Sequence, residues 1–496
     1  MICVTLGRTR HKHMIAEYEH LASQGIDLVE LRLDYIGRSV SLNRLLETRH
    51  CPVLITARRR EDGGRWNRPE DERLTLLRSA IAAGVDFVDI EGDVASQIPR
   101  YGQTKRVISY HDFDETPEDL EAIHDALASE DADIVKLATL ATSFEDNCRM
   151  MRLVRDAKIP TIGICMGEMG TCTRILASRL GSPFTYAAFG KDKKVAPGML
   201  HWKDMRDLYR VDSISPQTRL FGVVADPVAH SYSPMIHNGS FDEIDLDARY
   251  LPFRVPAPEL STFLNACPEI GIEGLSVTIP HKESAVLACD KAESAVTGIG
   301  AVNTLAFSQD EVLGYNTDYR AAMDCIGELF EIDKEAAKPL ANKRTLILGA
   351  GGVARAIAWG LRQRGCDVFI ASRNIDRAQN LAVDTECEVV PWSDRHEKEV
   401  DLIVNGTPVG MHPDVDRSPY EAKALDESVA VFDTVYNPEN TLFIKDARRA
   451  GCRIITGIDM FVRQAAYQFK LFTGVDAPAD EMRRIIKQAT NPVQLQ

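Results

Sequence analysis

The sequence predicts an α/β protein with two dissimilar halves, a (β/α)8 barrel followed by a two-lobed α/β unit. In the first 200 residues, short apolar runs rich in β-branched residues alternate with helical stretches. Polar residues gather late in these runs or directly after them. Near residue 350, a glycine-rich turn stands between a strand pattern and a helix pattern.

Length and composition limit the classes of protein to consider. The 496 residues predict about three domains, and an apolar content of 45% is enough to fill several cores. The 58 basic and 73 acidic residues give a net charge of −15. This sign argues against a main surface for nucleic acid or anionic lipid. We therefore expect binding of phosphate or carboxylate groups to be local.

The same sequence predicts a cytoplasmic protein without a metal. No apolar run of about 18 residues suggests a membrane-spanning helix. The first residues, Met1 to Leu6, are typical of a strand rather than of a signal or transit peptide. Eleven scattered cysteines show the spacing of neither a disulfide framework nor a zinc site.

The predicted strands of the first half number eight, which is the count of a TIM barrel. They are Ile2 to Leu6, Leu28 to Leu33, Val53 to Ala57, Phe87 to Ile90, Val107 to Tyr110, Ile134 to Ala138, Thr161 to Cys165 and Phe184 to Phe189. By count alone an open doubly wound sheet remains the alternative. The polar positions favour the barrel, because they would meet at its C-terminal face, where barrel enzymes hold their active sites. These positions are Glu30, Arg32, Arg58, Glu91, His111, Lys136 and Met166-Gly167.

Two interruptions of the pattern, and its end near Gly457, divide the chain. A short polar stretch with a proline, residues 213–217, precedes a new start at Leu220, and a second restart follows at Arg344. Regular β/α alternation then continues to Gly457. We predict a barrel over 1–212, a first lobe over 219–335, a nucleotide-binding domain over 336–458, and C-terminal helices over 459–496 that return to the first lobe.

The glycine-rich turn predicts a dinucleotide site of the Rossmann type. The strand Leu346 to Leu348 is followed by Gly-Ala-Gly-Gly-Val-Ala at 349–354, and a helix is expected over Arg355 to Arg364. Gly349 permits the tight turn, Gly351 lets the backbone approach pyrophosphate, and Ala354 permits close helix packing. A purely structural glycine turn is the alternative.

The next strand indicates which dinucleotide is bound. Val368 to Ala371 ends in Ser372-Arg373-Asn374, where an NAD site would carry an acidic residue. Arg373 would instead pair with a 2′-phosphate, so NADP is favoured over NAD. An ordinary solvated arginine is the alternative.

Ordered motifs after residue 220 resemble shikimate dehydrogenase. They are Phe221-Gly222-Val223, Pro227 to Asn238 (PVAHSYSPMIHN), Ser276 to Lys282 (SVTIPHK), Ala301 to Thr304, Gly314 to Asp318 (GYNTD), the glycine-rich turn, Asn405-Gly406-Thr407, and Gly457 with Met460 and Gln464. The resemblance implies an enzyme whose substrate lobe precedes an NADP-binding Rossmann domain.

Residues 1 to about 210 resemble a type I 3-dehydroquinate dehydratase. The matching pieces are Glu30 to Asp34, Thr56 to Arg58 leading to Gly63-Gly64, Ser109 to Phe113, Lys136 to Ala138, Met166-Gly167 with Arg174, and Ala196 to Gly198. The whole chain thus resembles the fused bifunctional enzyme, which implies consecutive steps of the shikimate pathway.

The resemblance implies a Schiff-base mechanism in the barrel. Lys136 would form an imine with C3 of 3-dehydroquinate, and His111 would act as base and then as acid. Burial and the nearby cations Arg58 and Arg174 would depress the pKa of Lys136. The implied substrate-binding residues are Glu30, Arg32, Arg58, Asp62 and Arg174. A simple interior ion pair between Glu30 and Arg32 is the alternative.

Three positions depart from the family pattern. Asp62 stands where the family has a glutamate that steadies the histidine, and it is one carbon shorter. The substrate-closing loop, typically Ser-Ala-Pro-Gly-Gln, has Val195 first and Met199 last here. Both polar side chains of that loop are replaced, which puts dehydratase affinity in doubt, though not the imine chemistry.

In the reductase half, the resemblance implies Lys282 and Asp318 as an acid/base pair. Ser231 and Ser233 would bind the substrate carboxylate, and Thr278, Asn303, Tyr436 and Gln464 would bind the rest of the ring. The implied NADP-binding residues are Gly349, Gly351, Gly352, Ala354, Ser372, Arg373, Asn374, Thr407 and Gly457. On local sequence alone, helix capping by Asp318 and turn formation by the two serines are the alternatives.

The expected partners are the small molecules 3-dehydroquinate, 3-dehydroshikimate and shikimate, with no nucleic acid and no membrane. Nothing in the sequence indicates an oligomeric state. Three other functions remain: a barrel that is an inactive scaffold beside an active reductase, a non-catalytic sensor of quinate or shikimate, and, if the resemblance is ignored, a class I aldolase barrel. The retained Lys282 and Asp318 argue against the sensor, because binding alone needs no proton donor.

Overall fold

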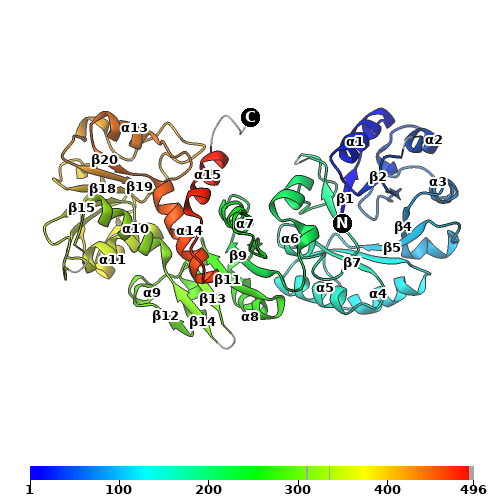
Figure 1. Cartoon of the computed structure of the whole chain (residues 1–496), viewed down its shortest axis with the longest axis horizontal. Helices are drawn as coiled ribbons and strands as arrows, with labels where there is room; N and C mark the ends of the chain where they lie inside the picture. The colour runs from blue at the N-terminus through cyan, green and yellow to red at the C-terminus, as the bar shows by residue number, and fades with distance from the viewer. Residues whose placement is uncertain (48, 191, 309–310, 334–335, 491–496) are drawn as a thin grey trace. The chain divides into compact units, whose positions relative to one another are not determined.

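The computed structural model describes residues 1–47, 49–190, 192–308, 311–333 and 336–490 (Figure 1). The chain divides into two compact units. One comprises residues 1–220 with 226–229 and 249–271, and the other comprises the rest. The predicted boundary at residue 335 and positions 491–496 of the predicted C-terminal segment lie outside the described residues.

The first sheet is a nearly closed parallel barrel, which confirms the predicted fold of the first half and excludes the open sheet. Its strands follow the order β7-β6-β5-β4-β3-β2-β1-β8. They are β1 (Ile2–Leu6), β2 (Leu28–Arg32), β3 (Val53–Thr56), β4 (Phe87–Glu91), β5 (Lys105–His111), β6 (Ile134–Leu140), β7 (Thr161–Met166) and β8 (Thr185–Ala188). Each lies within three residues of a predicted run at either end.

Helices follow most of these strands and cover the outside of the barrel. They are α1 (His11–Ser23), α2 (Leu42–Leu46), α3 (Glu70–Ala82), α4 (Leu120–Ser129), α5 (Phe144–Asp156) and α6 (Thr171–Ile175). Strands β1, β2 and β3 are buried along their whole length. This burial on both faces explains why they are near-continuous apolar runs rather than alternating ones.

The second sheet is mixed and has the strand order β10-β9-β11-β13-β14-β12. Its strands are β9 (Arg219–Ala225), β10 (Ala248–Arg254), β11 (Ile272–Val277), β12 (Lys291–Ala292), β13 (Thr304–Phe307) and β14 (Val312–Tyr315). The helices of this region are α7 (Ser233–Glu243), α8 (Leu260–Ile270), α9 (Ser294–Ile299) and α10 (Thr317–Leu329).

The third sheet is parallel and has the order β17-β16-β15-β18-β19-β20. Its strands are β15 (Arg344–Leu348), β16 (Asp367–Ala371), β17 (Glu388–Val389), β18 (Leu402–Asn405), β19 (Ala430–Asp433) and β20 (Arg453–Ile455), with helices α11 (Gly352–Gln363), α12 (Ile375–Thr385) and α13 (Leu442–Arg449). This is the Rossmann order, and its direction reverses between β15 and β18, where such sheets bind ligands. The glycine-rich turn follows β15.

Two C-terminal helices, α14 (Gly457–Thr473) and α15 (Ala479–Ala489), complete the second unit. Helix α14 packs against α10, β11 and β13, and α15 packs against α7 (Figure 1). The Ser276 hydroxyl donates to the Gln468 amide oxygen at 2.8 Å, which ties α14 to β11. The capping box of Thr456 and Asp459 fixes the start of α14.

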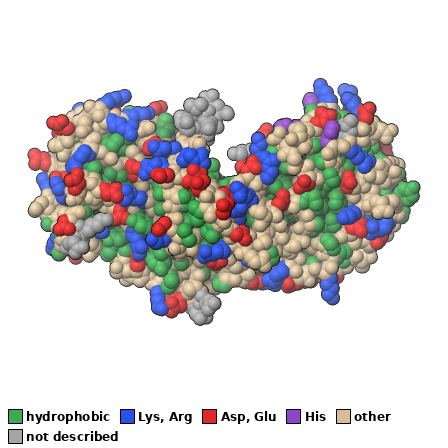
Figure 2. All heavy atoms as spheres, in the orientation of Figure 1, with side chains coloured by type: hydrophobic (Ala, Val, Ile, Leu, Met, Phe, Trp, Pro, Cys, Tyr) green, Lys and Arg blue, Asp and Glu red, His purple; other side chains and the backbone are tan. Residues whose placement is uncertain are grey.

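Charged side chains of both signs are interspersed over the face that Figure 2 shows. No helix in the described part of the chain is long and apolar enough to cross a membrane.

Candidate active sites

One cavity in the barrel brings together every predicted dehydratase residue. It has an empty volume of about 500 Å³ and lies among the C-terminal halves of the strands. Its lining includes Glu30, Arg32, Arg58, Asp62, His111, Lys136 and Arg174. On one side it is lined by Val195, Ala196 and Met199, which we call the apolar wall.

Lys136 is held by a carboxylate that the sequence analysis did not single out. The Lys136 side chain comes from β6 and is 6% exposed, and its Nζ donates to Oδ2 of Asp89 at 2.9 Å. Oδ1 of Asp89 accepts from Arg58 and from the Ser109 hydroxyl, each at 2.6 Å. Burial opposes the ionisation of Asp89, but Arg58 and Lys136 outweigh burial and hold its pKa well below the usual range. Asp89 is therefore ionised.

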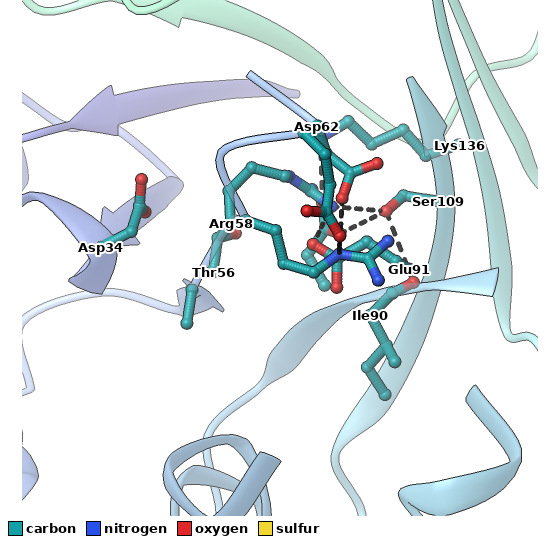
Figure 3. A network of polar contacts seen from close by, with 12 residues as sticks. Asp34, Thr56, Arg58, Asp62, Ile90, Glu91, Ser109 and Lys136 are labelled. Atoms are coloured by element: carbon teal, nitrogen blue, oxygen red, sulfur yellow. Dashed lines mark hydrogen bonds and ion pairs between the residues drawn. The ribbon is translucent and has the colours of Figure 1, made fainter. Parts of the chain in front are cut away.

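The guanidinium of Arg58 is bonded to the carboxylates around Lys136 and is not an unpaired charge in the cavity. Besides Asp89, its guanidinium donates to Glu91 at 2.7 Å and to Ser109 at 3.0 Å (Figure 3). Glu91 also accepts from Arg73 at 2.5 Å. Two carboxylates thus balance the charge of Arg58, and its contact with the substrate stays a prediction.

His111, at the end of β5, is a half-buried imidazole that is neutral at pH 7. Burial, followed by the charges of Arg58 and Lys136, lowers its pKa well below the ordinary value. Its Nδ1 has no hydrogen-bond partner among the described residues, and the ring stacks on Phe113 with centroids 6.4 Å apart. Such an imidazole is free to accept a proton.

Asp62 lines the cavity but bonds to Arg59, whose Nε donates to it at 2.7 Å. The shorter side chain therefore does not steady His111 as the longer glutamate of the family pattern would. The neighbouring Gly63 has φ of +75°, and a Cβ there would lie 2.1 Å from the Phe113 ring. The glycine thus allows this loop to pack tightly against the aromatic ring that stacks on His111.

Glu30 and Arg32 do not form the ion pair that was the alternative. The hydroxyls of Thr5 and Thr56 each donate to Glu30 at 2.7 Å. Arg32 makes two bonds to Asp34, at 2.9 and 2.8 Å. Glu30 and Arg32 thus bond to other residues, and the alternative of an ion pair between them is wrong. Both side chains line the cavity.

Arg174 is the cation of this cavity that lacks a carboxylate partner within the described chain. It is 2% exposed, its Nη2 donates only weakly to the Pro197 carbonyl at 3.4 Å, and its Nε has no described partner. Burial lowers its pKa to about 10, so it is still charged at neutral pH. A buried, unbalanced guanidinium is suited to binding a carboxylate.

In the second unit, the structure brings together the predicted acid/base pair. Nζ of Lys282 lies 2.6 Å from Oδ2 of Asp318. Lys282 follows β11, and Asp318 is the second residue of α10. The cap of this helix is Asn316, whose side chain accepts from the Tyr319 amide at 3.0 Å. The capping alternative for Asp318 is therefore wrong, and its carboxylate is available to Lys282.

Four residues predicted to bind the reductase substrate, Asn303, Ser231, Ser233 and Thr278, form hydrogen bonds with nearby parts of the chain. The Asn303 amide donates to the Thr317 hydroxyl at 2.9 Å and accepts from the Thr317 backbone at 2.7 Å, next to Asp318. The Ser233 backbone donates to the Ser231 hydroxyl at 3.3 Å, so the turn that was the alternative does form. The Thr278 backbone donates to the Val224 carbonyl at 3.1 Å, which places this loop beside β9.

Two further predicted residues come from the nucleotide domain and α14. Tyr436 stacks on Phe461 with ring centroids 4.4 Å apart, and burial raises its pKa to about 12. The Gln464 amide donates to the Phe461 carbonyl of its own helix at 3.1 Å. In the described chain no hydrogen bond joins Gln464 to Lys282 or Asp318.

The glycine-rich turn offers an open backbone cradle at the start of α11. Gly349 has φ of +108°, a conformation that favours glycine. A Cβ on Gly351 or Gly352 would meet no atom within 4 Å, so the space above the helix N-terminus is free. Ala354 is fully buried, which is the close packing predicted for it. These features fit a dinucleotide pyrophosphate.

The end of β16 fits the phosphate of NADP. The Asn374 side chain accepts from the Arg377 amide at 3.0 Å and caps α12, and the Ser372 hydroxyl accepts from the Asn374 amide at 3.3 Å. Arg373, between them, is exposed and makes no ion pair with any described residue. No acidic side chain stands at 372–374 to repel a 2′-phosphate.

The last two residues predicted to bind the cofactor, Thr407 and Gly457, make close contacts within the protein. The Thr407 hydroxyl donates to Asn405 at 2.6 Å. A Cβ on Gly457 would lie 2.2 Å from the Val435 carbonyl oxygen, so only glycine lets α14 begin so close to Tyr436.

Sequence reasoning missed Asp89, Tyr186 and Gln468. Asp89 stands two residues before Glu91 on the same face of β4, a spacing that could have revealed it. Gln468 is one helical turn after Gln464, and its amide donates to the Asn303 carbonyl at 3.2 Å. No sequence signal separates Tyr186 from an ordinary core tyrosine.

Comparison with known families assigns both halves. The type I 3-dehydroquinase family matches residues 2–216. The shikimate dehydrogenase substrate-binding domain matches residues 223–305, the shikimate/quinate 5-dehydrogenase family matches 331–429, and the shikimate 5′-dehydrogenase C-terminal domain matches 457–487.

Individual relatives agree. The chain is 35% identical to the chloroplastic bifunctional 3-dehydroquinate dehydratase/shikimate dehydrogenase of Arabidopsis thaliana, over 97% of this chain and 83% of that protein. It is 37% identical to the shikimate dehydrogenase (NADP(+)) of Methanopyrus kandleri, over 55% of this chain and 97% of the relative. A crystal structure of a shikimate dehydrogenase with NADP+ matches at a TM-score of 0.52 and 32% identity, covering 56% of this chain and 98% of that one. The chain belongs to the family of bifunctional 3-dehydroquinate dehydratase/shikimate dehydrogenases.

Proposed function

We propose that the chain catalyses two consecutive reactions, the dehydration of 3-dehydroquinate to 3-dehydroshikimate and the NADP-dependent reduction of that product to shikimate. The observation that carries the first step is the buried Lys136 paired with an ionised Asp89, in one cavity with a neutral His111 and an unbalanced Arg174. The matches to both enzyme families support the pairing of the two steps.

In the barrel, the Lys136 amine attacks the C3 ketone, and loss of water gives an iminium. The iminium draws electrons from C3 and so acidifies the C2 hydrogens. His111 removes a C2 proton as the C1 hydroxyl departs, and it returns that proton to the leaving hydroxyl as water forms. Hydrolysis of the iminium releases the product and restores the amine. Arg174 binds the substrate carboxylate, while Asp89 and Arg58 position Lys136.

In the second unit, Ser231 and Ser233 bind the carboxylate, and Thr278, Asn303, Tyr436 and Gln464 surround the ring. Lys282, held by Asp318, donates a proton to the ketone oxygen as it becomes a hydroxyl. NADPH, when bound, supplies the hydride for this reduction. The residues that would hold NADPH are those of the turn at 349–354 together with Ser372, Arg373 and Asn374. Thr407 and Gly457 would lie at the bottom of this site.

The partners in this proposal are the three small acids and NADP. The proposed compartment is the cytoplasm, supported by eleven cysteines that are all free thiols. The Arabidopsis relative is named as chloroplastic, which is a statement about that protein.

Two experiments test the proposal. Borohydride reduction in the presence of 3-dehydroquinate should leave a stable adduct on Lys136, seen by mass spectrometry of the peptide. Absence of an adduct in the folded protein would favour the scaffold alternative for the barrel. Reduction of NADP+ should proceed with shikimate, and a parallel assay tests whether quinate is also oxidised. No turnover with either would favour the sensor.

A further inference from the structure

Tyr186 presents an unsatisfied hydroxyl in the wall of the dehydratase cavity. It comes from β8, lines the cavity, and is 4% exposed. Its hydroxyl oxygen is buried and has no hydrogen-bond partner among the described residues. Leaving such a group unpaired lowers the stability of the folded protein, whereas a phenylalanine would fill the same space without that cost. The free enzyme therefore carries a donor that folding does not use.

The ring of Tyr186 is next to the reacting nitrogen. Nζ of Lys136 lies 4.3 Å from the ring centroid, over its face. The same nitrogen contacts Asp89 at 2.9 Å. A substrate carbon bound to this nitrogen must lie close to the tyrosine, and so must the groups on the neighbouring ring carbons. The ring of Tyr186 is thus within reach of a substrate joined to Lys136.

The apolar wall next to Tyr186 supplies no polar side chain, and the nearby Arg174, whose Nη2 donates to the Pro197 carbonyl at 3.4 Å, is assigned to the substrate carboxylate. The apolar wall of Val195, Ala196 and Met199 packs into one hydrophobic cluster with Tyr186. These wall positions have no side-chain donor, and two of them are where the family pattern carries serine and glutamine. A hydroxyl of a polyhydroxylated carbocycle buried against this wall would lose its water without compensation. The phenol of Tyr186 is the group placed to replace it.

We propose that Tyr186 is a positioning and affinity residue of the dehydratase site, whose hydroxyl bonds to a hydroxyl of the bound substrate in place of polar side chains at 195 and 199. The inference rests on the proposed function, because it needs a substrate joined to Lys136. Its effect is on binding: the phenol takes no proton from the reacting carbons, so His111 and Lys136 retain their roles.

The test compares the full-length protein with its Tyr186→Phe variant. We expect the KM for 3-dehydroquinate to rise about three- to tenfold, because the variant loses one hydrogen bond to the substrate. The kcat should change less than about twofold. The melting temperature of the free protein should be equal or higher, while its increase on adding substrate and borohydride should be smaller. The reductase activity of the same preparation reports that the chain is folded.

A second variant tests the placement against the wall. Met199→Gln places an amide in the loop, and in the Tyr186→Phe background it should recover most of the lost affinity. An unchanged KM in Tyr186→Phe, or failure of Met199→Gln to restore it, would overturn the proposal. Either result, with the Lys136 adduct still forming, would leave the proposed dehydratase intact. Loss of the adduct in the parent protein would instead refute the function itself.

Discussion

Lys136 and Asp89 form a buried ion pair at 2.9 Å, and the same carboxylate holds Arg58 at 2.6 Å. A single anion therefore joins the amine proposed as nucleophile to the guanidinium of Arg58, which follows β3. Because Asp89 is fully buried, this arrangement fixes where Nζ points. It also supplies a negative charge beside the nitrogen that becomes positive in the iminium.

Replacing Asp89 with asparagine should disable the dehydratase and weaken the barrel. The change leaves Arg58 and Lys136 without their shared anion, and breaking a buried ion pair costs about 3 to 5 kcal/mol. We expect kcat/KM for 3-dehydroquinate to fall at least about a hundredfold, since misplacement of a reacting group is that costly. Urea unfolding measures the stability and a steady-state assay measures the rate.

Asp93→Asn is the matched control for this change. Asp93 also pairs with an arginine, Arg59, but it is 60% exposed. Its replacement should change stability by less than about 1 kcal/mol. Equal effects of the two substitutions would contradict the special position of Asp89.

The pH dependence of the dehydratase should reflect the lowered pKa of His111. Burial and the neighbouring cations disfavour the imidazolium, so the neutral base is lost only when the pH falls below the ordinary value of 6.5. The acid limb of kcat/KM should therefore have its midpoint below pH 6.5. A midpoint at or above that value would contradict the assignment of His111 as the base.

Arg174→Met should separate stability from affinity. Removing an unbalanced buried cation relieves its desolvation, so the free protein should be equally or more stable. Binding of the substrate carboxylate loses a charge-assisted pair, and we expect KM to rise about a hundredfold. The control is Arg100→Met, which removes an arginine that is already paired with Asp131 and Asp133. A destabilised Arg174→Met protein with unchanged KM would show a structural role instead.

Asp318→Asn should impair only the reductase. Lys282 would lose the carboxylate 2.6 Å away that positions it. We expect kcat for shikimate oxidation to fall about a hundredfold, within the usual contribution of acid/base groups, with the helix intact because Asn316 caps it. Dehydratase activity, measured on the same sample, should not change. An unaltered kcat would remove Asp318 from the proposed mechanism.

Arg373→Ser should weaken the preference for NADP. The exposed guanidinium is the group placed to pair with the 2′-phosphate, and its loss should raise the KM for NADP+ about tenfold or more while leaving that for NAD+ nearly unchanged. Parallel titrations of the two cofactors measure the change. A parallel rise for both cofactors would indicate a general disturbance of the fold.

The sequence predicts strands and helices well where a single regular pattern of apolar residues or glycines marks them. Strands β1, β2 and β3 of the barrel are buried along their whole length, and their apolar runs are short and bounded by polar turns. The strand before Gly349 ends at Leu348 as predicted. The following helix begins at Gly352, three residues earlier than expected. Glycines are poor helix formers, but here they open the first turn and leave its amides free.

Side-chain partners were harder to predict because they depend on neighbouring strands. The resemblance implies that Arg58 binds the substrate, but it does not indicate that Asp89 and Glu91 of β4 balance the charge of Arg58. Glu30 and Arg32 are two residues apart on one strand, yet each is bonded elsewhere. Asp89 is a single polar residue inside an apolar run, so its contact with Lys136 becomes visible only once β4 and β6 are placed in one barrel.

The central claim is that one chain holds two separate amines with separate reactions, and a coupled assay tests it most directly. With 3-dehydroquinate and NADPH, the parent protein should consume NADPH and form shikimate. Lys136→Ala should abolish this flux but still reduce added 3-dehydroshikimate, and Lys282→Ala should stop after 3-dehydroshikimate accumulates. Mixing the two variants should restore the flux. Loss of both steps in either folded variant, or retention of the complete flux in one of them, would contradict the account.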